Sequence, residues 1–158
     1  MSTPLTLQPG CECIIRSLGQ DKKIARRLAQ MGVLPGSSLR VIRLAPFGET
    51  VEVSIDQGQY LALRAEEIKA LDCEMVAMPL SAKTVKKDQD YRIRFLSGGE
   101  TFRQRMERQG IIPGAVIRIR ELSRYPFQIE LLPGGKNVVL GQGEAEKIII
   151  EVISDPEE

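Results

Sequence analysis

Short stretches of alternating apolar and polar residues make up most of this chain, and two stretches follow a helical period instead. In the first, Ile24, Leu28 and Met31 are spaced at i, i+4 and i+7, which places them on one face of a short amphipathic helix. Asp21 precedes this segment and suits an N-cap, whose carboxylate accepts a hydrogen bond from an otherwise unpaired amide. Gly32 follows the segment and suits the positive φ with which many helices end. The pattern predicts a helix between Asp21 and Gly32.

A variant of this segment returns later in the chain at an offset of 78 residues. Residues 26–36 (RRLAQMGVLPG) correspond to residues 104–114 (QRMERQGIIPG). Phe102 and Met106 continue the apolar stripe in the second copy. Each copy has a basic helical turn that stops at glycine, then two aliphatic residues, then a Pro-Gly pair suited to the centre of a type II turn. Two copies of one structural unit are therefore predicted, spanning residues 1–76 and 77–158.

The remaining segments of each unit read as short strands joined by turns. In the first unit we predict strands over residues 11–16, 38–44, 51–55, 60–63 and 69–75, turns at 46–49 and 56–58, and a helical turn at 65–68. In the second unit we predict strands over residues 91–95, 116–120, 129–132, 138–140 and 148–152. Five antiparallel strands, with a helix after the first and a helical turn before the last, close most naturally into a small barrel. The expected fold class is mainly β, a β-barrel with short helices in each unit.

Composition and charge exclude several classes of function. The chain has 22 basic and 21 acidic residues, a net charge of +1, so no global field draws it to nucleic acid or anionic lipid. It has no histidine, which removes the commonest general base and metal ligand. The Gly98-Gly99 and Gly134-Gly135-Lys136 segments lack the spacing of a phosphate-binding loop and are predicted to be turns. No apolar run approaches the roughly 20 residues that cross a bilayer, and residues 1–4 begin no signal peptide, so we expect a cytoplasmic protein.

The order of motifs in the first unit resembles the FeoA ferrous-iron-transport domain. The matching segments are Pro4-Leu5-Thr6, Arg27-Leu28, residues 31–36 (MGVLPG), Leu61-Ala62-Leu63-Arg64 and Ala65-Glu66-Glu67-Ile68. The second unit keeps Arg105-Met106, residues 110–114 (GIIPG) and Glu146-Lys147-Ile148, but has Leu140-Gly141 where the first unit has Leu63-Arg64. The order of segments is shared by both units, so we identify the chain as similar to a tandem FeoA-domain protein.

The resemblance implies two tandem SH3-like small barrels without catalysis of their own. It implies a regulator of ferrous iron transport that contacts the FeoB-type membrane transporter, which has a G-protein domain, and that reaches the membrane only through that partner. It also allows binding of a transition metal ion such as Fe(II) or Zn(II). A similar barrel occurs in metal-responsive repressors of the diphtheria-toxin-repressor type, but no helix-turn-helix segment precedes it here, which disfavours a repressor.

A nucleic-acid-binding small barrel is the other alternative to an iron-transport adaptor. Proteins of that class stack bases on aromatic side chains. Aromatic residues make up 4% of the chain and tryptophan is absent, so the chain has few side chains on which bases could stack. Nucleic acid is therefore not an expected partner.

The basic helices and the aliphatic pairs after them are the candidate partner-binding residues. In the first unit these are Lys22, Arg26, Arg27, Val33 and Leu34, and in the second Arg105, Ile111 and Ile112. Cationic side chains beside apolar anchors suit contact with an acidic partner surface. The simpler interpretation is a solvated helix face, and one residue of each aliphatic pair is expected to enter the core.

Three cysteines are the candidate metal ligands. Cys11 and Cys13 lie on the same face of the predicted first strand, and Cys73 lies in the last strand of that unit, which can pair with the first in a small barrel. Three converging thiolates could hold a soft metal. Core packing is the favoured interpretation, because cysteine is among the most often buried residues and the second unit has no equivalent of the three.

Overall fold

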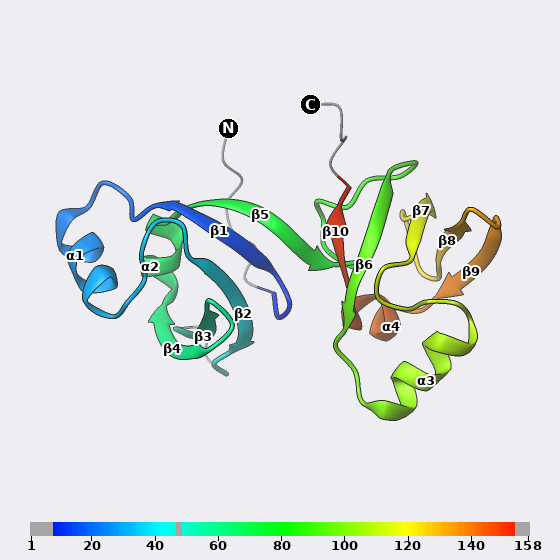
Figure 1. Ribbon diagram of the computed structural model, residues 1–158, viewed down its shortest axis with the longest axis horizontal. Helices are drawn as coiled ribbons and strands as arrows, with labels where there is room; N and C mark the ends of the chain where they lie inside the picture. The colour runs from blue at the N-terminus through cyan, green and yellow to red at the C-terminus, as the bar shows by residue number, and fades with distance from the viewer. Residues whose placement is uncertain (1–7, 47–48, 154–158) are drawn as a thin grey trace. The chain divides into compact units, whose positions relative to one another are not determined.

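The computed structural model describes residues 8–46 and 49–153 and divides the chain into two compact units, Met1–Val76 and Ala77–Glu158. Both units have the same order of elements (Figure 1). Unit 1 contains β1 (Glu12–Ser17), α1 (Lys22–Gln30), β2 (Ser38–Leu44), β3 (Thr50–Ile55), β4 (Gln59–Arg64), α2 (Ala65–Ala70) and the start of β5 (Asp72–Pro79). Unit 2 contains β6 (Asp90–Leu96), α3 (Glu100–Arg108), β7 (Val116–Glu121), β8 (Phe127–Leu132), β9 (Lys136–Leu140), α4 (Gln142–Lys147) and β10 (Ile148–Val152).

Each unit is built on one antiparallel sheet. In unit 1 the strand order is β4-β3-β2-β1-β5, and in unit 2 the last residues of β5, Met78–Pro79, begin the order β5-β10-β6-β7-β8-β9. Equivalent hairpins share their register, with Val41 opposite Val53 in unit 1 and Ile119 opposite Ile129 in unit 2. The predicted fold class, mainly β in two SH3-like small barrels with short helices, is confirmed.

Neither sheet closes by hydrogen bonding, which differs from the expected closed barrel. The strand order leaves β4 at one end of the sheet in unit 1 and β9 at one end in unit 2. The helical turns α2 and α4 follow these strands directly, so the chain leaves the sheet before it enters the last strand. The helical turn thus fills the place where two strands would otherwise pair.

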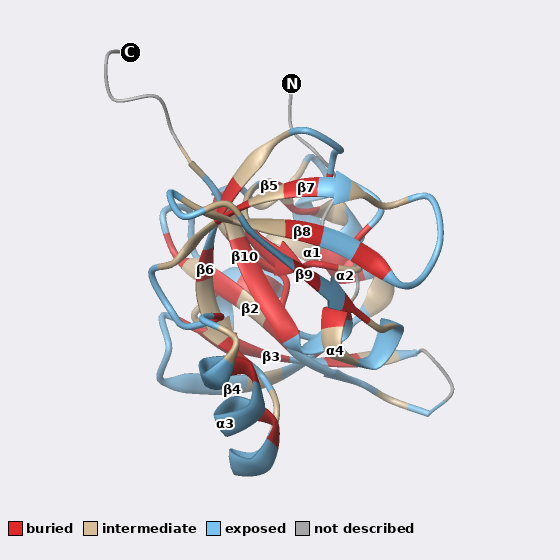
Figure 2. Cartoon of the chain, turned by 90° about the vertical axis from the view of Figure 1, so that its right-hand side faces the viewer, coloured by how far each residue is buried: buried red, intermediate tan, exposed pale blue. Residues whose placement is uncertain are grey.

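The core of each unit comes from alternating strand residues covered by the long helix. Leu39, Val41, Val51 and Val53 are fully buried in unit 1, as is Leu28 of α1. In unit 2 the corresponding buried set is Ile117, Ile119, Ile129 and, from α3, Met106 (Figure 2). Full burial of such a side chain stabilises a fold by about 1.5–3 kcal/mol. The pattern of apolar positions in the sequence therefore locates both cores.

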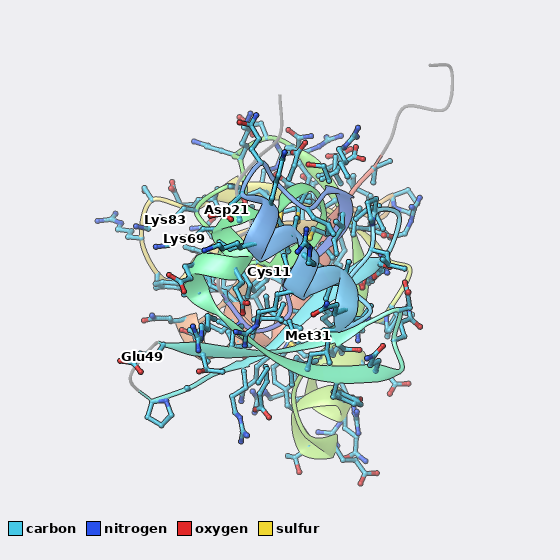
Figure 3. The ribbon with its side chains drawn as sticks, turned by 90° about the vertical axis from the view of Figure 1, so that its left-hand side faces the viewer. Cys11, Asp21, Met31, Glu49, Lys69 and Lys83 are labelled. Atoms are coloured by element: carbon cyan, nitrogen blue, oxygen red, sulfur yellow. The ribbon has the colours of Figure 1, made fainter. Side chains whose placement is uncertain are left out.

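The predicted ends of the first helix are confirmed. The Asp21 carboxylate accepts hydrogen bonds from the amides of Lys23 (3.0 Å) and Ile24 (3.2 Å), and Figure 3 shows Asp21 and Met31 at opposite ends of α1. Gly32 has a φ of 91°, a conformation that glycine adopts without steric cost. The equivalent Gly110 has a φ of 89°, so both helices are followed by a glycine in the same left-handed conformation.

The boundary between α2 and the last strand of unit 1 differs from the prediction. A strand is predicted over residues 69–75, but Lys69 and Ala70 complete α2 and β5 begins at Asp72. Leu71, between the two elements, is buried and ends the helix with an extended backbone. Two further predictions, the turn at 46–49 and the motif Pro4-Leu5-Thr6, include residues 47–48 and 4–6, which lie outside the described residues.

Candidate functional site

The exposed side of α1 carries cations without nearby compensation. Lys22, Lys23 and Arg26 are exposed, and α1 contains no acidic residue. Among the residues that the structure describes, no carboxylate forms an ion pair with any of the three. We call these three residues, together with Leu34, the α1 face. Three cations that have no internal partner are free to interact with a charged surface of another molecule.

Arg27, the other predicted cation of this helix, is held inside unit 1. Its Nε lies 2.9 Å from Oε2 of Glu67, a buried carboxylate of α2. Oε1 of Glu67 accepts a hydrogen bond of 2.8 Å from the backbone amide of Arg64. One carboxylate therefore caps α2 and fixes it to α1, and Arg27 is a structural residue rather than a free contact residue.

Arg105 repeats this arrangement in unit 2. Its Nη2 lies 3.3 Å from Oε2 of Glu144, and Oε1 of Glu144 accepts a hydrogen bond of 2.9 Å from the Gly141 amide. Sequence reasoning missed Glu67 and Glu144. The signal that could have found them is a glutamate at the third position of each short helix, where its side chain can reach back to the helix start.

The two aliphatic pairs divide between core and surface, as expected. Val33 and Ile111 are fully buried, whereas Leu34 and Ile112 are 49% and 44% exposed. The inward position follows from the helix ending. The Val33 amide donates to the Leu28 carbonyl at 2.9 Å, which returns the chain over the last helical turn and turns Val33 toward Leu28.

This division corrects the candidate set. Val33 and Ile111 cannot touch a partner, because the helix ending buries both side chains. Leu34 and Ile112 remain as exposed anchors beside the helices. Each lies in a Pro-Gly turn whose hydrogen bond measures 3.0 Å in both units, so its position on the surface is fixed by the backbone.

Unit 2 has a groove beside α3 with a volume of about 760 Å³. Its apolar lining consists of Phe95, Leu96, Ile112 and Pro113. Its rim is formed by four exposed residues of α3, namely Glu100, Arg103, Gln104 and Glu107. We call this feature the α3 groove. Its volume lies in the range of about 300–1,000 Å³ that is typical of ligand-binding sites.

The fold brings Cys13 within hydrogen-bonding contact of Cys73, which lies 60 residues later in the sequence. All three are free and buried. Burial raises the pKa of the Cys11 thiol to about 11, and a hydrogen bond to Cys73 together with burial raises the pKa of Cys13. The same hydrogen bond lowers the pKa of Cys73. A metal ligand must be the thiolate, which the surroundings of Cys11 and Cys13 disfavour.

The wider search for metal ligands agrees with this view of the thiols. The described parts of the chain contain no group of three or more His, Cys, Asp or Glu side chains that could hold a metal ion. The residues present therefore do not fit a resident metal ion.

The same parts of the chain contain no helix long and apolar enough to span a membrane.

Burial predicts that the thiols of the folded protein resist modification. At pH 8 a water-soluble disulfide reagent is expected to modify less than one thiol per chain in the folded state and all three in urea, because all three thiols are buried and the Cys11 thiol, with a pKa of about 11, is almost entirely protonated. Absorbance of the released thiolate measures both values. Rapid modification of two or three thiols without denaturant would contradict the buried positions of the cysteines.

A family model matches each of the two units, which supports the repeated architecture. The FeoA domain model matches residues 5–75 and again residues 78–152. A solution structure of iron(II) transport protein A from Clostridium thermocellum is 28% identical, with a TM-score of 0.49, and the match covers 100% of this chain and 91% of that one. A FeoA-like protein from Clostridium acetobutylicum is 21% identical, with a TM-score of 0.43, over 51% of this chain and 91% of that one.

A repressor structure also matches part of the chain, whereas no curated protein matches it. A manganese-dependent transcriptional repressor in complex with manganese is 22% identical, with a TM-score of 0.44, over 48% of this chain and 37% of that one. A search of curated proteins finds no significant match.

Proposed function

Because the chain belongs to the FeoA-domain family, which matches it twice, we propose that it is a non-enzymatic, cytoplasmic adaptor that contacts a FeoB-type transporter. FeoA domains serve ferrous iron transport, so the chain has a role in that process. Fe(II) is then the cargo of the transporter. The proposal does not require a resident metal ion in this chain.

The α1 face is the observation that carries this proposal. Lys22, Lys23 and Arg26 are exposed on α1, Leu34 is exposed in the turn that follows the helix, and no described carboxylate forms an ion pair with the three cations. Cations around an apolar anchor form the kind of surface that binds an acidic patch of a partner with specificity and fast association. We propose that this surface contacts the cytoplasmic G-protein portion of the transporter.

The test is capture of the G-protein portion of the cell's own transporter by the purified full chain. Lys22→Glu/Arg26→Glu is expected to weaken capture about tenfold or more, because each reversal replaces an attraction with a repulsion. Arg27 is left unchanged, since its substitution would also break the ion pair with Glu67. Surface plasmon resonance at two salt concentrations measures the effect, and capture by the wild type should weaken as salt rises.

The matched control is Lys83→Glu/Lys87→Glu, which makes the same charge change at two exposed lysines of unit 2. This variant should bind as the wild type does. Equal capture by the wild type and the α1 variant would move the contact elsewhere. Absence of capture in every nucleotide state, with and without Fe(II), would overturn the proposal.

A further inference from the structure

We propose that this chain associates with a second copy of itself, with the α1 face of one copy seated in the α3 groove of the other. This inference goes beyond the proposed contact with the transporter. It rests on a charge difference between two surfaces that are otherwise equivalent in the repeated fold.

The long helices of the two units differ in charge at two equivalent exposed positions. Under the offset of 78 residues, Lys22 corresponds to Glu100 and Ala29 corresponds to Glu107. Helix α1 carries four basic and no acidic residues, whereas α3 carries three basic and two acidic residues. Contact between two α1 faces would bring like charges together. Contact between an α1 face and an α3 groove brings Lys22 and Arg26 to carboxylates.

The carboxylates of the α3 groove are available for such a contact. Glu100 and Glu107 are exposed, and neither forms an ion pair within the part of the chain that the structure describes. Glu100 accepts one long hydrogen bond, of 3.5 Å, from Gln104 of its own helix. Pairing with a lysine or arginine from another molecule would therefore not break an internal ion pair.

The apolar parts of the two surfaces also match. Leu34 projects from the α1 face and is 49% exposed, and the α3 groove offers Phe95, Leu96 and the 44% exposed Ile112. A leucine inserted among these side chains buries apolar area on both sides, which stabilises association by about 25 cal/mol per Å² removed from water. The groove thus receives the apolar anchor, and its acidic rim receives the flanking cations.

The proposed contact joins two different surfaces. Each copy carries one α1 face and one α3 groove, so a single contact between two copies leaves one surface of each kind free. Further copies can add at the free surfaces unless two copies exchange both contacts and close as a two-fold dimer.

Arg103 provides a diagnostic for the proposed orientation. It lies on the rim between Glu100 and Glu107 and faces the incoming cations with the same charge. Removal of this charge by Arg103→Ala is expected to tighten association by about threefold to tenfold, since a like charge opposite another disfavours binding. A residue with a merely structural role would weaken association or leave it unchanged.

The test is sedimentation velocity of the full chain across a wide range of concentrations. The wild type should associate reversibly, and both Lys22→Glu/Arg26→Glu and Glu100→Lys/Glu107→Lys should weaken association about tenfold or more. The decisive sample is an equal mixture of these two variants. In that mixture every α1 face meets a groove of opposite charge, so association should return although neither variant associates alone.

Three outcomes would overturn the inference. These are a wild type that stays monomeric at every concentration, association that survives both charge reversals, and a mixture that stays monomeric although both variants melt like the wild type. Failure here is distinguishable from failure of the proposed function, because no transporter is present in the assay. Glu100→Lys/Glu107→Lys also keeps the α1 face intact, so it should still capture the transporter if that proposal is right.

Discussion

Replacement of Leu28 by alanine is expected to destabilise unit 1 by about 3 kcal/mol, within the range of about 2–5 kcal/mol found for buried leucines. Leu28 is fully buried, and it is the residue of α1 that is buried in unit 1. Its removal leaves a cavity beneath a short helix that has little intrinsic stability of its own. Urea denaturation of the full chain measures the loss, and hydrogen exchange with mass spectrometry localises it to residues of unit 1.

The matched control is Leu34→Ala, the same chemical change six residues later. Leu34 is half exposed, so its loss should change stability by no more than about 0.5 kcal/mol. The two variants separate folding from docking, because Leu34→Ala should weaken partner capture while unit 1 remains folded. A Leu28→Ala variant within about 1 kcal/mol of the wild type would contradict the packing of α1 on the sheet.

Local patterns in the sequence predicted most elements of the fold. The strands Ser38–Leu44 and Ile148–Val152 have the predicted bounds, because clear turn signals and regular apolar spacing flank them. The N-cap Asp21 and the helix stop at Gly32 are also as predicted. In each case the decisive interaction lies within a few residues of the chain, where side-chain chemistry and backbone preference are visible without the fold.

Interactions between distant residues were not predictable in the same way. Arg27 pairs with Glu67, 40 residues away, and nothing in the helical pattern distinguishes it from Arg26, which has no such partner. Glu12 likewise reads as an ordinary polar strand residue, yet it is buried and pairs with Arg40 across the β1–β2 register at 3.2 Å. The candidate set therefore combined exposed cations without a described ion pair with Arg27, whose partner Glu67 could be identified only from the fold.

The repeat helps most where the two units differ. Arg27 and Arg105 have equivalent internal partners, which identifies their role as structural in both units. Lys22 and Glu100 occupy equivalent exposed positions and differ in charge, so no shared structural role explains them. Interactions that both units share, such as those of Arg27 and Arg105, are therefore assigned to the stability of the fold. Exposed positions that differ in charge between the units, such as Lys22 and Glu100, are the candidates for binding.

Replacement of Glu67 by alanine is expected to destabilise unit 1 by about 2–3 kcal/mol. Loss of the carboxylate removes the hydrogen bond to the Arg64 amide, worth about 1 kcal/mol, and the ion pair with Arg27. Removal of one partner of a fully buried pair costs about 3–5 kcal/mol, but the Arg27 side chain is half exposed and can regain water, which lowers the expected cost. Urea denaturation of the full chain gives the free energy of unfolding.

Glu144→Ala is the matched variant in unit 2 and should cost less, about 1 kcal/mol, because Glu144 is more exposed than Glu67 and its ion pair is longer. A double-mutant cycle that combines Glu67→Ala with Arg27→Ala should give a coupling energy of about 1 kcal/mol or more, since the side chains of Glu67 and Arg27 are in direct contact. Zero coupling would show that Arg27 is free in solution. Arg27 would then rejoin Lys22 and Arg26 as a candidate contact residue, and the α1 face would carry four available cations instead of three.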